Sequence, residues 1–353
     1  MTKASATTGS AAAYLKALDD AIGDNDEAQA VTSFIDTGYE PLNMAMSGRP
    51  DGGIPQGRLT EVFGESSTGK TALATKWMVT AQQMGGVAIF EDWERSFDVG
   101  LAQGFGLNIE RPHWIYKRPK TWEEGNVFTG RAVKAIRDAG IIPDDAPIIA
   151  VHDSIAAAIP NSMMYDSKGN VREMDTYSMN DTTALARVTS TTLKTMAQIA
   201  GEYNATFIYL NQMRLKPGVV YGDPRTTPGG KAMEFYSTVR LALGREKITE
   251  GKGKDAEFAG QKIGIQVVKS KLTKPFQTAK LRLMYDDDGA AFFDTVLSTL
   301  EYLTESKALS MAGSYVEWVD GSKSYPKALA KKIHDDSSMQ VILRDLVVKA
   351  LTA

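Results

Sequence analysis

The segment Gly64-Glu-Ser-Ser-Thr-Gly-Lys-Thr71 constrains this chain more than any other feature. Its spacing, G-x-x-x-x-G-K-T, lets glycines turn several backbone N–H groups toward a phosphate chain. Lys70 would reach the terminal phosphates, and the Thr71 hydroxyl would take a position on Mg²⁺. A helix beginning at Lys70 would direct its positive end at the same anion. The predicted nucleotide contacts are Gly64, Glu65, Ser66, Ser67, Thr68, Gly69, Lys70, Thr71 and Ala72.

The flanks of this loop support that interpretation. A β-like run, Arg58–Phe63, precedes it, and a stretch rich in helix formers, 71–84, follows it and ends at Gly85-Gly86. Strand, glycine-rich loop and helix form the context in which the motif binds phosphate. The alternative, a chance Gly/Ser-rich turn before a helix, leaves the strand unexplained.

Composition narrows the classes of function. Among 353 residues, 40 are basic and 43 acidic, so any binding of nucleic acid must depend on local charge. The absence of cysteine excludes disulfides and thiolate zinc sites, and three scattered histidines argue against a histidine-based metal site. We find no apolar run that would span a membrane and no signal peptide, so we expect a cytoplasmic protein.

The pattern of apolar runs predicts three parts. Residues 1–32 combine a flexible start, a helix at 11–22 and an acidic stretch. Residues 33–289 alternate strands with helices, which predicts an α/β core: a mostly parallel twisted sheet flanked by helices, with an antiparallel extension. Its strands are expected at 58–63, 87–90, 148–151, 207–210, 239–243, 263–268 and 279–284, and its helices include 122–139 and 183–203. Residues 290–353 are expected to form a small C-terminal domain of short helices.

Acidic residues follow two of the expected strands. Asp153 ends the run 147–153, where an acid can hold Mg²⁺, although it could instead cap the next helix. The segment 91–98 follows another strand, and Glu94 is our candidate for orienting an attacking water, with Glu91 as runner-up. A solvated acidic loop is the alternative.

A third strand end carries Gln212, placed to touch a γ-phosphate. The long Gly/Pro-rich segment after it holds Arg214, Lys216 and Arg225, and it suits a nucleic-acid backbone or is simply a surface loop. Lys269 and Lys271 end a later strand, and spacing alone favours an ordinary solvated strand end.

These residues resemble the RecA family of DNA recombinases, bacterial and phage. The resemblance covers 34–293 and is carried by 209–241, which is similar to the family's second DNA-binding loop with its flanks, and by 267–276, similar to its lysine strand. The segments 37–48 and 52–58 are similar to the family's lead into the core. The implied fold is a RecA-type phosphate-loop ATPase core with a helical N-terminal polymerisation arm.

The resemblance implies a role for each matching position. Glu94, 24 residues after Lys70, would be the catalytic carboxylate, Asp153 the Walker B acid beside Thr71, and Gln212 the γ-phosphate sensor. Lys269 and Lys271 would reach the γ-phosphate of a neighbouring subunit. Three residues would lie near adenine, the last a candidate contribution from a neighbour: Asp98, Leu101 and Tyr285.

Two DNA-binding loops are implied, near 160–182 and 213–230. The first is longer than the family pattern and rich in Met and Tyr. The implied DNA contacts are Met179, Arg187, Lys194, Arg214, Lys216, Tyr221, Arg225, Thr226, Gly229 and Gly230. The C-terminal end lacks an acidic tail, so we expect no regulation of that kind.

The resemblance implies an ATP- and Mg²⁺-dependent recombinase that forms filaments on single-stranded DNA and pairs that strand with duplex DNA. Single-strand-binding and mediator proteins are further expected partners, and a membrane is not. The main rival is a hexameric DnaB-like helicase, for which we expect a large N-terminal collar. A non-enzymatic mediator and a small-molecule kinase are less favoured, because Lys70, Glu94 and Gln212 are intact and a basic loop replaces a substrate lid.

Overall fold

A computed structural model describes residues 12–14, 16–17, 20, 30–176, 183–215, 225–251, 256–286 and 288–353. The chain divides into two compact units, 1–32 and 33–353. In the first unit the described residues between 12 and 20 are helical, and the rest of the predicted helix 11–22 lies outside the described residues. Within the described ranges, no helix is long and apolar enough to cross a membrane.

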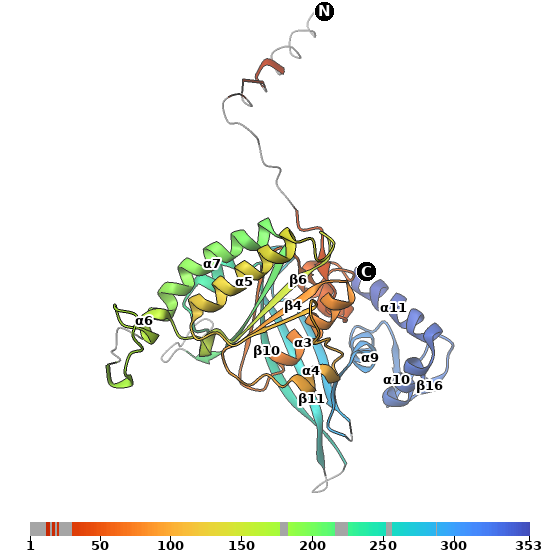
Figure 1. Cartoon of the computed structure of the whole chain (residues 1–353). Helices are drawn as coiled ribbons and strands as arrows, with labels where there is room; N and C mark the ends of the chain where they lie inside the picture. Colours follow the sequence, from red (N-terminus) through yellow and green to blue (C-terminus); the bar gives the residue numbers. More distant parts are fainter. Residues whose placement is uncertain are drawn as a thin grey trace, which may run out of the picture. The chain divides into compact units, whose positions relative to one another are not determined.

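The second unit is built on one large sheet (Figure 1). Among the described residues it has nine strands in the order β13-β12-β11-β10-β3-β7-β6-β4-β5. The strands from β10 to β5 pair in parallel, and β10 to β13 pair antiparallel, as the sequence predicts. The strands are β3 Leu59–Gly64, β4 Val87–Asp92, β5 Trp114–Lys117, β6 Ile148–Asp153, β7 Ala205–Gln212, β10 Val239–Glu250, β11 Glu257–Ser270, β12 Thr278–Tyr285 and β13 Ala291–Asp294.

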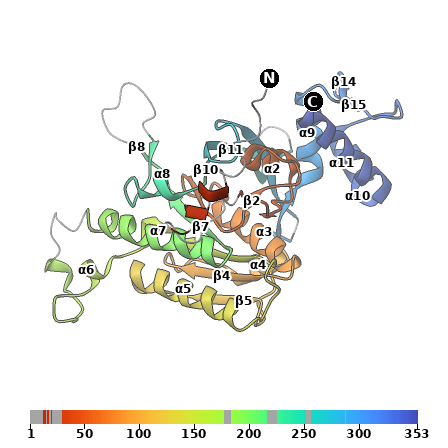
Figure 2. The ribbon, with the colours of Figure 1, turned by 90° about the horizontal axis from the view of Figure 1, so that it is seen from above.

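Helices cover both faces of this sheet because successive strand residues point in opposite directions. In β4, Ala88 and Phe90 join one apolar layer, whereas Val87 and Ile89 join the other. The first layer includes α2 Glu40–Ser47, α3 Lys70–Gln83 and α4 Val99–Gly104. The second, where α5 and α7 lie side by side (Figure 2), includes α5 Trp122–Asp138, α7 Ala184–Glu202 and α8 Ala232–Tyr236.

The carboxyl ends of the parallel strands meet at one edge of the sheet. Gly64 at the end of β3 is paired with Gln212 at the end of β7. Asp92 at the end of β4 is paired with Asp153 at the end of β6. This register brings the loops that follow β3, β4, β6 and β7 together, although they are far apart in the sequence.

Short elements complete the core outside the large sheet. Strands β1 and β2 pair antiparallel, as do β8 and β9. Between β6 and α7, the described residues form two 3₁₀ turns and one short helix. These elements are β1 Phe34–Ile35, β2 Ile54–Pro55, η1 Ile155–Ala157, α6 Asn161–Met164, η2 Met174–Thr176, β8 Arg214–Leu215 and β9 Arg225–Thr226.

The last part of the chain has its own apolar cluster, which includes Leu300, Trp318 and Leu343. Before it, β13 still belongs to the large sheet. A three-stranded sheet accompanies the helices there and is absent from the sequence-based expectation. The elements are α9 Thr295–Glu305, β14 Ser310–Ala312, β15 Tyr315–Glu317, β16 Lys323–Ser324, α10 Pro326–Asp335 and α11 Ser337–Thr352.

Candidate nucleotide-binding site

The loop 64–71 joins β3 to α3 as the motif predicts. Gly69 caps α3 with φ 86°, a left-handed conformation that favours glycine. A Cβ at Gly69 would also lie 2.5 Å from Cδ1 of Ile263, so the neighbouring strand leaves no room for a side chain. The backbone N–H groups at the start of α3 therefore stay accessible to an anion.

Lys70 lies inside this loop. Its Nζ donates to the carbonyl oxygens of Glu65 at 2.8 Å and Gly64 at 3.3 Å. Burial lowers the pKa of Lys70, and the charges of Asp153 and Glu94 partly oppose that effect. Phosphate oxygens could replace these carbonyl oxygens at little cost, since each accepts the same N–H donors.

Thr71 and Asp153 provide oxygen ligands suited to Mg²⁺. The Thr71 hydroxyl donates to Oδ2 of Asp153 at 2.8 Å. Burial, together with the charges of Glu94 and Asp92, raises the pKa of Asp153 to about 7, although the Thr71 hydrogen bond and Lys70 lower it. A cation at this position would relieve the cost of that buried carboxylate.

In the described part of the chain, no cluster of three or more His, Cys, Asp or Glu side chains could hold a metal ion. Mg²⁺ in nucleotide sites needs only one or two carboxylates, because phosphate and water complete its shell. Thr71 and Asp153 therefore fit Mg²⁺ brought in with a nucleotide.

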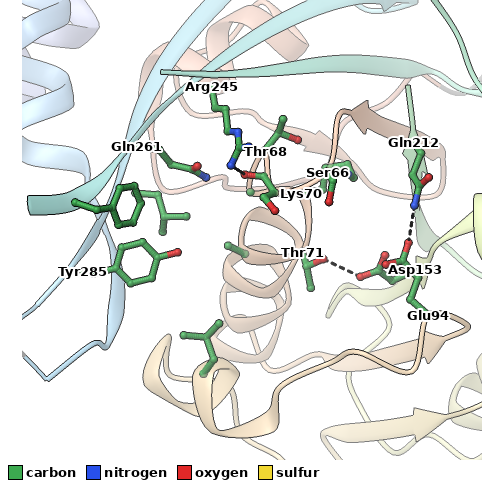
Figure 3. A pocket seen from close by; sticks show the side chains of 16 residues that line it. Ser66, Thr68, Lys70, Thr71, Glu94, Asp153, Gln212, Arg245, Gln261 and Tyr285 are labelled. Atoms are coloured by element: carbon green, nitrogen blue, oxygen red, sulfur yellow. Dashed lines mark hydrogen bonds between the residues drawn. The ribbon is translucent and has the colours of Figure 1, made fainter. Parts of the chain in front are cut away.

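Glu94 faces the same space (Figure 3). Its Oε1 accepts a hydrogen bond from the Ser154 hydroxyl, and Nε2 of Gln212 lies 3.4 Å from the same oxygen. The backbone N–H groups of Trp93 and Glu94 both donate to the carbonyl of Asp153. The runner-up carboxylate, Glu91, points to the α5 face of the sheet, and it does not line the pocket.

The pocket has a volume of about 440 Å³ and extends from Glu94 and Gln212 to an aromatic end formed by β11 and β12. There the Phe258 and Tyr285 rings lie 5.6 Å apart. Twelve predicted residues line the pocket: Ser66, Ser67, Thr68, Gly69, Lys70, Thr71, Ala72, Glu94, Leu101, Asp153, Gln212 and Tyr285.

Four pocket residues are missing from the sequence prediction: Arg245, Phe258, Gln261 and Leu283. Arg245 donates to the carbonyl oxygen of Ser67 at 3.2 Å. The sequence holds a clue to two of them, because side chains alternate between the two faces of a strand. Arg245 follows Leu243 by two residues and Gln261 precedes Ile263 by two, so each polar side chain shares the apolar face of its strand.

Some predicted nucleotide residues do not line the pocket. Gly64 and Glu65 contribute carbonyl oxygens to Lys70 instead. Asp98 caps α4, because its carboxylate accepts the backbone N–H of Leu101 at 2.9 Å.

Lys269 and Lys271 also lie outside the pocket of their own chain. The Lys269 ammonium donates to the carbonyl oxygens of Glu234 and Phe235 at the end of α8. Burial, helped by the nearby charges of Lys271 and Arg240, lowers the pKa of Lys269 to about 8.

Several predicted DNA contacts lie outside the described residues: Met179, Lys216 and Tyr221. Of the others, Arg187, Lys194 and Arg214 are exposed, and the first two lie on α7. The β8–β9 pairing joins Arg214 to Thr226 and Leu215 to Arg225 at the base of the second loop.

Gly229 and Gly230 close the base of that loop against α7. Both have positive φ, 88° and 73°. A Cβ at Gly229 would lie 3.1 Å from Ile155, and one at Gly230 would lie 3.1 Å from Ala186. The positive φ disfavours a side chain at either position, and a Cβ would also force these neighbours to shift by a few tenths of an ångström.

The strand–loop–helix with Lys70 and Thr71, the acid at the end of β6 and the carboxylate Glu94 define a phosphate-loop nucleoside triphosphatase of the α/β class. The model of the RecA N-terminal domain family matches residues 17–290. The chain belongs to the RecA family.

Curated relatives are consistent with this membership. The chain is 30% identical over 304 residues to "Protein RecA" of Clostridium tetani, covering 86% of this chain and 78% of that protein. It is 32% identical over 284 residues to "Protein RecA" of Thermus aquaticus, covering 80% and 75%. It is 34% identical over 251 residues to "Protein RecA" of Symbiobacterium thermophilum, covering 71% of this chain and 64% of that protein. The protein is a RecA-like DNA recombinase and a DNA-dependent ATPase, of a family that forms filaments and exchanges strands. The helicase alternative is not favoured.

Proposed function

We propose that the pocket binds ATP with Mg²⁺ and hydrolyses it to control a recombinase filament. The observation that carries the proposal is the convergence of Lys70, Thr71, Asp153, Glu94 and Gln212 on one cavity. Mg²⁺, when bound, neutralises charge that develops on the phosphates. Lys70 binds the terminal phosphates, and Thr71 and Asp153 hold the ion.

Glu94 orients the attacking water and accepts its proton as general base. The Ser154 hydroxyl and Gln212 both contact Oε1, which leaves the other carboxylate oxygen for water. Since Gln212 lies beside Glu94, its amide can exchange that carboxylate for a γ-phosphate oxygen once ATP is present.

The nucleotide is linked to the second DNA loop through the backbone. Met213, directly after Gln212, donates its N–H to the carbonyl of Gly64 at 3.0 Å, and β8 begins at the next residue. A shift of Gln212 toward phosphate would therefore move the stem of the loop. ATP acts as an order–disorder switch for DNA binding, and hydrolysis reverses it.

The filament interface shares the site between subunits. Lys269 and Lys271 reach the γ-phosphate of the neighbouring subunit, a role that is compatible with their position outside the pocket of their own chain. Single-stranded or duplex DNA binds through its backbone, largely independent of sequence, to the exposed Arg187, Lys194 and Arg214. Single-strand-binding and mediator proteins assist assembly, and the protein works in the cytoplasm.

Electron microscopy with ATP and single-stranded DNA tests the proposal. Wild-type protein should form continuous helical filaments, whereas closed rings would favour a motor. Lys70→Ala should bind no nucleotide and form no ATP-dependent filament. Glu94→Gln should bind ATP and DNA but hydrolyse poorly, so its filaments persist. If Glu94→Gln hydrolyses ATP at the wild-type rate, Glu94 is not the catalytic carboxylate.

A further inference from the structure

A polar pair is buried directly behind the catalytic segment, on the face of the sheet covered by α5. Oε2 of Glu91 lies 2.9 Å from Nδ1 of His152, and Oε1 accepts the Thr129 hydroxyl at 2.6 Å. Both members of the pair are 0% exposed. Burying such groups in an apolar layer costs free energy even when they are partnered, so stability alone does not explain the pair.

The pair supports the turn that carries Glu94. The His152 ring stacks on Trp93 at 5.8 Å between centroids, and on Tyr209 at 4.3 Å. Trp93 immediately precedes Glu94, and the backbone N–H groups of both donate to the carbonyl of Asp153, the residue after His152. Any shift of the imidazole is therefore transmitted to the Glu94 backbone through one ring contact.

Helix α5 packs tightly against this cluster. A Cβ built on Gly125 would overlap the Trp93 ring and the Glu91 carboxylate, and only glycine allows the helix to come this close. Trp122 of the same helix stacks on Trp93 at 5.7 Å. The turn before Glu94 is thus held between α5 and the His152 ring.

We propose that Glu91 and His152, acting through Trp93, are positioning residues that set the catalytic geometry of Glu94. This inference rests on the proposed role of Glu94 as the catalytic carboxylate. A displacement of about 1 Å at a reacting group can cost up to ~10²-fold in rate. Loss of the support should therefore lower kcat about tenfold. Nucleotide affinity should change far less, because Lys70 and the phosphate loop belong to other strands and only Asp153 of the proposed nucleotide contacts adjoins the pair.

The test is the double variant Glu91→Leu/His152→Leu in the full chain, because replacing both partners leaves no unpaired buried charge. DNA-dependent ATP turnover should show a kcat about tenfold lower, with KM for ATP within about twofold of wild type. His152→Asn keeps an N–H donor for Glu91 but removes the ring that stacks on Trp93, so it should also lower kcat and leave KM within about twofold of wild type. Gly125→Ala, which pushes on the cluster from α5, should lower kcat in the same way.

The matched control is Thr206→Val. Its hydroxyl is buried in β7 and has no partner among the described residues, so it should keep wild-type kcat. A folded double variant with wild-type kcat overturns the inference. A rise in KM that accounts for the lost kcat/KM overturns it too, as does full turnover by Gly125→Ala. Glu94→Gln separates the two proposals. If this variant retains full turnover, the proposed catalytic role of Glu94 is wrong, and the positioning inference falls with it for that reason alone.

Discussion

The Arg240–Glu61 pair offers a stability test whose size follows from its burial. The Glu61 carboxylate is fully buried and accepts Nε of Arg240 at 2.6 Å and Nδ2 of Asn211 at 2.9 Å. The guanidinium also lies over the Phe63 ring, 5.0 Å from its centroid. Arg240→Met leaves the carboxylate buried with one neutral donor. Breaking a buried pair in this way costs about 3–5 kcal/mol of the free energy of unfolding.

Thermal unfolding followed by circular dichroism measures the loss. At roughly 2 °C per kcal/mol for a large domain, Tm should fall by about 6–10 °C. Glu61→Met/Arg240→Met should recover most of it, since the remaining loss is one hydrogen bond from Asn211, worth about 1 kcal/mol.

The control is Arg49→Met, which breaks the exposed Arg49–Asp51 pair at 2.9 Å and should leave Tm unchanged. Two results would refute the reasoning. One is a Tm for Arg240→Met within 2 °C of wild type, on the scale of about 2 °C per kcal/mol. The other is a double variant no more stable than the single one.

Three further outcomes are expected. Arg245→Ala should raise the Kd of ATP several-fold but leave adenosine binding unchanged, because its cation lines the pocket; equal losses for both ligands in calorimetry would contradict a phosphate contact. Because the pKa of Lys269 is lowered to about 8, ATP-dependent assembly measured by light scattering should weaken above pH 8. The contribution of Lys269 to the free energy of unfolding should instead rise between pH 8 and 10.5, because in that range only the unfolded state keeps the lysine protonated. Chelating Mg²⁺ should abolish turnover without lowering Tm, since the Thr71–Asp153 hydrogen bond needs no ion; a large drop in Tm would indicate a structural metal.

The convergence of the site was predictable from the sequence. Parallel strands that alternate with helices end at one edge, so the segments after Phe63, Val151 and Leu210 had to meet. The phosphate loop needed only its own spacing and its flanking strand and helix. These are local or topological rules, and they hold without knowledge of side-chain packing.

The face of each acid in β4 was not predictable. The sequence places the end of the strand at Phe90, but β4 continues to Asp92. Glu91 and Asp92 therefore point to opposite faces, and Glu94 lies in the following turn. Arg245 was missed because the predicted strand stops at Leu243, whereas β10 continues to Glu250. Phe258 was missed for a different reason: it reaches the pocket through the long-range register of β10, β11 and β12, which includes two bulges.

The charges that line the pocket of one subunit bear on whether a second subunit completes the site. In the residues that the structure describes, the cations lining the pocket are Lys70 and Arg245, and the acids are Glu94 and Asp153. With both carboxylates ionised, as a bound Mg²⁺ would favour for Asp153, these charges cancel, while a triphosphate carries more negative charge than one Mg²⁺ neutralises. Beyond the backbone N–H groups at the start of α3, a cation from elsewhere would balance the remaining charge. Burial and nearby cations lower the pKa of Lys269, and contact with an anion would oppose that effect. A neighbouring subunit that places Lys269 at the γ-phosphate would satisfy both requirements, so hydrolysis would weaken the subunit interface itself.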